Sequence, residues 1–84
     1  MRQIILDTET TGLSWEKGNR IVEIGCVEYF DRRPTGRTFH RYLNPEREME
    51  PGAAEVTGLT LDFLSDKPLF AEIADEFRIR CRVS

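Results

Sequence analysis

The chain has 84 residues, with 12 lysines and arginines against 15 aspartates and glutamates, so its formal net charge is −3. This length suits one small domain with a marginal hydrophobic core. A content of 39% hydrophobic and 32% charged residues is ordinary for a folded protein and argues against disorder. The small acidic excess gives no overall basic character, so composition neither supports nor excludes a nucleic-acid partner.

The cysteines and the N-terminal residues indicate the cellular compartment of the protein. Cys26 and Cys81 stand far apart, without a C-x-x-C or Cys/His spacing around them, so the sequence implies neither a zinc site nor a disulfide framework. The apolar run at 4–6 ends at Asp7, which is far short of a signal segment or a membrane span. We therefore expect a reduced, cytoplasmic protein that does not enter a membrane.

The first element expected along the chain is a short buried strand at 2–8, because its apolar residues would face both sides of a sheet. Side chains alternate along a strand, so Asp7 and Glu9 share one face if the extended conformation continues through Glu9. The stretch from Thr10 to Asn19 contains two glycines and an asparagine and is predicted to be a loop.

Two more strands are predicted next. Residues 20–30 are rich in β-branched and aromatic side chains, which is typical of a central strand. Pro34 and Gly36 then interrupt the pattern before a further strand at 37–43, so we expect an antiparallel hairpin with a longer loop. Gly25, inside the central strand, indicates a bulge or a close backbone approach.

Helices are expected in the remainder. Pro51 suits the first turn of a short helix at 53–56, Gly58 would end that helix, and Thr60 is a suitable N-cap for another.

A longer amphipathic helix is predicted to begin at Asp66 and Pro68 and to run to about residue 80. Its apolar stripe at four-residue spacing consists of Leu69, Ile73, Phe77 and Cys81.

Asp7 and Glu9 are the residues most suggestive of chemistry. Two strand residues on one face lie about 6.5 to 7 Å apart, so their carboxylates can converge on magnesium or manganese ions. Nucleases with two metal ions use such carboxylates. Two alternatives stay open on spacing alone: solvated acids at a strand end, and an acid/base pair of the glycosidase kind. His40, the only histidine, is predicted to be structural or a surface residue.

Longer motifs give a resemblance. The string ILDTETTGL at 5–13, followed by RIVEIG at 20–25, closely resembles the first motif of the DnaQ-like (DEDD) 3′–5′ exonucleases. The resemblance continues at 39–45, 56–60 and 63–68, and the segment 70–77 is similar to the epsilon-type branch, the proofreading subunits of bacterial DNA polymerase III. Residues 1–77 match in order and at the family's spacing.

The resemblance implies an α/β fold of the ribonuclease H-like type. This chain would form its N-terminal portion: a three-stranded part of a mixed sheet, then short helices and one amphipathic helix. The implied cofactors are two Mg²⁺ or Mn²⁺ ions, with Asp7 and Glu9 as catalytic metal ligands. The implied partners are a DNA 3′ end and the alpha and theta-type polymerase subunits. The residues implied to contact the 3′-terminal nucleotide are Thr8, Thr10, Thr11, Gly12, Leu13 and Thr57, the last at a position where many members carry histidine.

The sequence also departs from the family's pattern. The family uses an aspartate from a second motif and a histidine and an aspartate from a third, all beyond the helix near Pro68, and these 84 residues do not reach those motifs. Residues 78–84 lose the resemblance and are expected to be a divergent tail after an exonuclease part at 1–77. We therefore expect a truncated or frameshifted piece that is inactive alone. The alternative is a non-catalytic module that binds metal or a polymerase.

Overall fold

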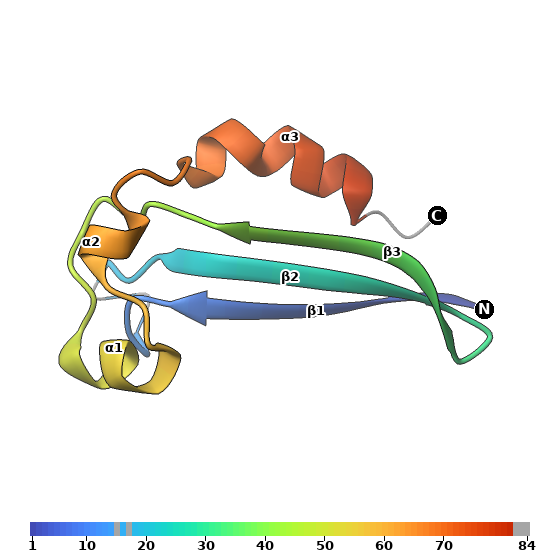
Figure 1. The fold of residues 1–84 in the computed structure, drawn as a ribbon, viewed down its shortest axis with the longest axis horizontal. Coiled ribbons are helices and arrows are strands. Elements are labelled where there is room, and N and C mark those ends of the chain that lie inside the picture. The colour runs from blue at the N-terminus through green and yellow to red at the C-terminus, as the bar shows by residue number, and fades with distance from the viewer. Residues whose placement is uncertain (15, 17, 82–84) are drawn as a thin grey trace.

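The structure is a computed structural model that describes residues 1–14, 16 and 18–81. Three antiparallel strands form one sheet in the order β1-β2-β3, helices α1 and α2 gather at one end of the sheet, and α3 lies along one face (Figure 1). The elements are β1 (Arg2–Thr10), β2 (Ile21–Phe30), β3 (Arg33–Tyr42), α1 (Pro51–Thr57), α2 (Leu61–Leu64) and α3 (Phe70–Arg80). None of these helices is long and apolar enough to cross a bilayer.

The central strand β2 carries the core. Its buried side chains alternate with more exposed ones, as expected for a strand with one face covered. The cluster beneath α3 consists of Ile24, Cys26, Phe39, Leu43 and Ile73. A second cluster, Val22, Leu59 and Leu64, lies at the end of the sheet that α2 covers. Among the described residues, no helix covers the opposite face of the sheet along most of its length (Figure 1).

The connection between β2 and β3 is shorter than predicted. Asp31 and Arg32 have φ values of 49° and 69°, so a tight turn joins the strands, and the prediction of a longer loop is wrong. Proline is tolerated in β3 because β3 is an edge strand of the described sheet. The remaining residues expected in the longer loop belong to β3 and break its register with β2. Tyr29 pairs with Pro34, whereas Val27 pairs with Thr38.

The short helices are confirmed. Pro51 lies in the first turn of α1, which ends at Thr57 and is followed by Gly58 as C-cap in the left-handed region with φ of 72°. The hydroxyl of Thr60 accepts a hydrogen bond from the backbone N–H of Phe63 at 3.2 Å and so caps α2.

The start of α3 differs from the prediction. The helix begins at Phe70 rather than near Asp66, and the Glu72 carboxylate accepts from the backbone N–H of Leu69 at 2.9 Å. The residues just before α3 form hydrogen bonds outside the helix. The backbone N–H of Lys67 donates to the Leu64 carbonyl, and the Pro68 carbonyl accepts from the backbone N–H of Asn44. The end of α3 at Arg80 is as predicted, and residues 82–84 of the expected tail lie outside the described part.

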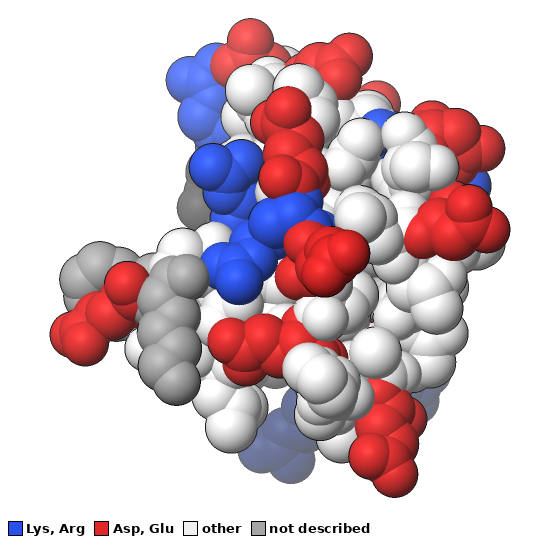
Figure 2. All heavy atoms as spheres, turned by 90° about the vertical axis from the view of Figure 1, so that its left-hand side faces the viewer, with Lys and Arg blue, Asp and Glu red and all other residues white. Residues whose placement is uncertain are grey.

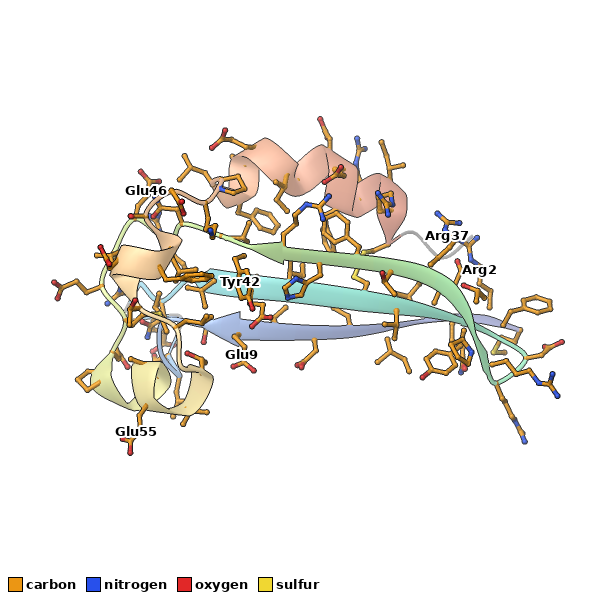
Figure 3. All side chains as sticks on the ribbon, in the orientation of Figure 1. Arg2, Glu9, Arg37, Tyr42, Glu46 and Glu55 are labelled. Carbon is orange, nitrogen blue, oxygen red and sulfur yellow. A yellow bond between two sulfur atoms is a disulfide. The ribbon has the colours of Figure 1, made fainter. Side chains whose placement is uncertain are left out.

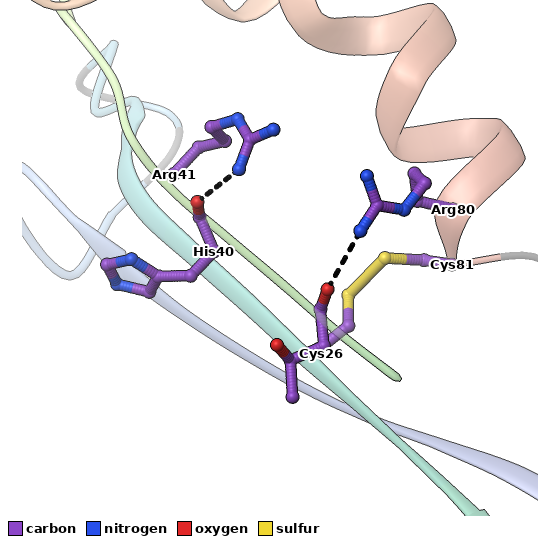
Figure 4. Close-up of a disulfide and its surroundings, with 6 residues drawn as sticks. Cys26, His40, Arg41, Arg80 and Cys81 are labelled. Atoms are coloured by element: carbon purple, nitrogen blue, oxygen red, sulfur yellow. Dashed lines mark hydrogen bonds between the residues drawn. A yellow bond between two sulfur atoms is a disulfide. The ribbon is translucent and has the colours of Figure 1, made fainter. Parts of the chain in front are cut away.

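A disulfide joins Cys26 to Cys81, with a Cα–Cα distance of 6.5 Å (Figure 4). No disulfide framework was expected from the sequence, and this expectation is therefore wrong. Spacing could not indicate the bond, because 55 residues separate the cysteines. The bond depends on the tertiary packing that places the last residue of the α3 stripe over the middle of β2.

Candidate functional site

Asp7 and Glu9 lie within β1, which extends two residues further than predicted. Ile4 packs against the cluster beneath α3, so the alternation of the strand directs Asp7 and Glu9 to the opposite face. Figure 3 shows the Glu9 side chain directed away from α3. The two carboxylates therefore point to the same, open side of the sheet, as predicted.

The strand register places a polar group beside them. Glu9 pairs with Glu23 on β2, and Asp7 pairs with Gly25, which in turn pairs with His40 on β3. A hollow of about 160 Å³ is formed there. It is lined by Asp7, Thr8, Glu9, Glu23, Gly25 and His40. Carboxylates from two strands thus share one shallow depression.

Glu23 and His40 form a hydrogen-bonded pair inside this group. The His40 Nε2 lies 2.5 Å from the Glu23 Oε2. We assign the donor role to Nε2, because a carboxylate oxygen accepts hydrogen bonds. The ring of His40 also packs edge-on against Tyr42, with centroids 4.9 Å apart. His40 is therefore partnered on the same face as Asp7 and Glu9, although sequence analysis gave it no functional role.

A larger pocket of about 320 Å³ opens on the other side of Glu9, between the end of β1 and helix α1. Its lining residues are Glu9, Thr10, Gly12, Leu13, Glu50, Gly52, Ala53, Val56 and Thr57. Leu13 and Val56 expose most of their side chains there. Glu9 belongs to both hollows and so joins the acidic group to this mainly apolar pocket.

The loop that carries the pocket is held from within by Thr11. This side chain is fully buried, donates to the Asn19 carbonyl oxygen Oδ1 at 2.7 Å, and accepts from the backbone N–H of Arg20 at 3.0 Å. A Cβ on Gly12 would collide with the carboxylate of Glu50 and the amide of Asn19. A side chain at position 12 would therefore require the ends of the Glu50 and Asn19 side chains to move.

The structure brings most of the predicted contact residues together. Thr10, Gly12, Leu13 and Thr57 line the larger pocket, Thr8 lines the smaller hollow, and Thr11 supports the loop without lining either. Sequence analysis missed the lining residues from α1 and its N-cap, namely Glu50, Gly52, Ala53 and Val56. Pro51 predicted a helix there, but nothing in the sequence indicated which element this helix would face.

Asp7 and Glu9 offer hard oxygen donors of the kind that Mg²⁺ and Mn²⁺ prefer. Among residues 1–14, 16 and 18–81, no three His, Cys, Asp or Glu side chains converge as a metal-binding group. The donor chemistry therefore fits a divalent cation, whereas the number of converging donors corresponds to part of a coordination shell.

The end of the molecule that carries α1 and α2 shows mixed charge. In Figure 2 basic side chains gather near the centre of this face, and acidic side chains surround them. Arg20 contributes an ion pair with Glu46, with 3.7 Å between nitrogen and oxygen. The electrostatics of this face are local rather than those of a broad basic surface.

Comparison with known proteins identifies the class. Residues 4–82 match the RNase T-type family model described as "Exonuclease", so the chain belongs to this exonuclease family. The chain is 56% identical over 77 residues to the DNA polymerase III subunit epsilon of Rickettsia felis, covering 92% of the chain and 34% of that protein. It is 54% identical over 80 residues to the subunit of the same name from Escherichia coli, covering 90% and 33%. The chain spans about a third of the length of these curated relatives.

Solved structures agree on the fold. Exonuclease X in complex with 5′-overhanging duplex DNA superimposes with a TM-score of 0.76 at 28% identity, covering 88% of this chain and 42% of that one. Product-bound exonuclease I gives a TM-score of 0.80 at 21% identity, covering 93% and 19%. The three antiparallel strands and following helices therefore form part of a DEDD exonuclease fold of the ribonuclease H-like type, as predicted.

Proposed function

We propose that this chain supplies one half of a 3′–5′ proofreading exonuclease centre of the DNA polymerase III epsilon type. In this proposal Asp7 and Glu9 are the first two ligands of a pair of Mg²⁺ or Mn²⁺ ions. The observation that supports it best is the position of Glu9. It adjoins both the acidic hollow and the 320 Å³ pocket, so a nucleotide in the pocket would have its phosphate next to the carboxylates.

The pocket suits the terminal nucleotide of a DNA 3′ end. Its volume lies within the range typical of small-ligand sites. Leu13 and Val56 offer exposed apolar surface for a base or sugar, and the glycine at 52 leaves the backbone accessible. The Thr57 hydroxyl donates to the Ala53 carbonyl at 2.8 Å, so Thr57 shapes the edge of the pocket.

The bound ions would supply a nucleophilic water and stabilise the leaving oxygen of the phosphodiester. The residues of this chain hold the ions and seat the nucleotide. The resemblance places an aspartate of a second motif and the histidine and aspartate of a third beyond Pro68, and the given residues contain neither motif. We therefore propose that residues 1–77 form the exonuclease part, that 78–84 diverge from it, and that the chain does not hydrolyse DNA alone.

The similarity to epsilon subunits also supports proposals about partners and location. We expect the working complex to include alpha and theta-type polymerase subunits and to act in the cytoplasm. A second candidate function is a non-catalytic module that binds a metal ion or a polymerase. It is favoured by the exposure of Ile5 and Leu6 on β1, each 53% exposed, since exposed apolar surface is typical of a protein interface.

A chimera separates the two candidates. We expect that replacing the matching segment of the Escherichia coli epsilon subunit by residues 1–77 yields an enzyme that releases nucleotides from 3′-labelled single-stranded DNA with Mg²⁺. Asp7→Asn in the chimera should lower the rate by at least about 100-fold, because a carboxylate that would hold the metal ions is lost. The 84-residue chain itself should release none.

Two results would contradict the proposal. One is a folded chimera without activity, which would favour the non-catalytic module. The other is nucleotide release by the chain alone that Asp7→Asn abolishes, since the chain would then need no further motif.

A further inference from the structure

Three carboxylates lie close together on β1 and β2, yet they do not converge. Glu9 and Glu23 face each other in the strand register, and such cross-strand partners have Cβ atoms about 4.5 to 5.5 Å apart. Asp7 stands two residues from Glu9 on the same face. Nevertheless no three potential ligands among the described residues form a metal-binding group. A hydrogen bond from β3 engages one of these carboxylates.

His40 provides that interaction. Its Nε2 holds the Glu23 Oε2 at 2.5 Å, so the Glu23 carboxylate is directed toward β3 rather than toward Glu9 on β1. Gly25 lies beside the ring: a Cβ built there would be in ordinary van der Waals contact with the His40 Cδ2, at 3.7 Å. Tyr42 contacts the ring edge-on at an interplanar angle of 88°, which fixes its orientation.

We propose that His40 is a positioning residue that withholds Glu23 from the cation site. The site then keeps Asp7 and Glu9 as its ligands from this face, and the remaining coordination positions stay open to phosphate oxygens of the substrate. The pairing also separates the negative charges of Glu23 and Glu9, which repel when directly opposed on neighbouring strands. This inference rests on the proposed function, because it takes Asp7 and Glu9 as cation ligands.

Removing the ring should therefore strengthen cation binding. In His40→Ala the Glu23 carboxylate is free to turn toward Glu9 and act as a third ligand. Affinity for hard cations rises with the number of carboxylate ligands, so we expect Mn²⁺ to bind the variant at least about tenfold more tightly than the wild-type chain. The measurement is the free Mn²⁺ signal in electron paramagnetic resonance during titration of the 84-residue chain.

Matched variants isolate the effect. His40→Ala/Glu23→Gln should lose the gain, because the third carboxylate is gone. His40→Gln should stay near wild-type affinity, since its amide can donate to Glu23 in place of the ring. Glu23→Gln alone should bind within about twofold of wild type, because Glu23 is not a ligand in the native arrangement. Circular dichroism of each variant reports that the sheet is retained.

The outcomes distinguish this inference from the proposed function. An unchanged affinity in His40→Ala, a gain that persists in the double variant, or a large loss in Glu23→Gln would each overturn the role of His40. Asp7→Asn provides the other arm: it should abolish wild-type Mn²⁺ binding. If Asp7→Asn leaves binding unchanged, the proposed cation site itself fails.

Discussion

Glu28 shows how a single carboxylate organises an irregular part of the sheet. It lies on β2 opposite the register break in β3. The Thr35 hydroxyl donates to its Oε1 at 2.9 Å and the Arg2 Nε to its Oε2 at 2.6 Å, while Arg37 lies 3.7 Å away. The hydrogen bond from Thr35, followed by the interactions with Arg2 and Arg37, lowers the pKa of Glu28 from its ordinary value of 4.5, although burial opposes the shift. The native state therefore holds this group ionised more firmly than the unfolded chain does.

The consequence is a defined dependence of stability on pH. Because the folded pKa of Glu28 is lower, the unfolded chain binds the proton more readily. The contribution of the ionised Glu28 to the stability of the folded chain is present above pH 4.5 and is lost as the pH falls through the folded pKa. We expect Glu28→Gln to be less stable than wild type at neutral pH. As the pH falls below 4.5, the stability of Glu28→Gln should decrease less than the stability of wild type does. Urea midpoints measured from neutral to acid pH test this, with Glu55→Gln at an exposed position of α1 as the control. Parallel curves for wild type and Glu28→Gln would contradict the account.

The sequence allowed part of the site to be predicted at this scale. The shared face of Asp7 and Glu9 follows from strand alternation alone. The Glu23–His40 pair depends on the register between β2 and β3, and the burial of Thr11 depends on how the loop closes on Asn19. Neither has a local pattern in the chain.

Helix α3 is the element that the disulfide affects most. Ile73 is its only buried residue among those described, and Phe77 packs partly against the cluster beneath it. Arg41 on β3 adds an ion pair with Glu76, and Arg80 donates to the Thr38 carbonyl. The Cys26–Cys81 bond therefore supplements a thin apolar contact at the C-terminal end of the helix.

Reduction should destabilise the chain. A disulfide closing a loop of about this size restricts the unfolded state by about 4 kcal/mol in the chain-entropy model. We expect the thermal midpoint of the oxidised chain to fall by more than about 10 °C on addition of dithiothreitol. Cys81→Ser should match the reduced wild type and should not respond to reductant. Equal midpoints for the oxidised and reduced wild type would show that the bond contributes nothing. In a reducing cytoplasm the bond would stay open, so this gain would be absent there.

The elements show which features of the sequence are local. Pro51, Gly58 and Thr60 act within one helical turn, and each prediction from them is confirmed. The tight turn at Asp31 and Arg32 was missed because neither residue is glycine or asparagine, whereas Pro34 and Gly36 attracted the loop prediction. The start of α3 was placed too early because the backbone around Pro68 is engaged with Asn44, a contact that only the fold reveals.

At the scale of the whole molecule, the fold was predictable because long motifs resemble one family in order and spacing. Helix α3 covers one face of the sheet, and Ile5 and Val27 stay exposed on the other face, beside Asp7. Position within the sheet thus places a polar site and apolar surface side by side. Sequence periodicity alone predicted the strand but not how much of it would stay uncovered.

The most direct test of the central claim locates a bound cation in the 84-residue chain. Traces of Mn²⁺ are added to the ¹⁵N-labelled chain, and the broadening of backbone amide signals is recorded by NMR. The account predicts selective broadening at residues 7–9 of β1 and at 23–25 of β2, lost in Asp7→Asn/Glu9→Gln. Broadening that persists in this double variant, or that centres on the exposed acids Glu46 and Glu48 instead, would contradict it.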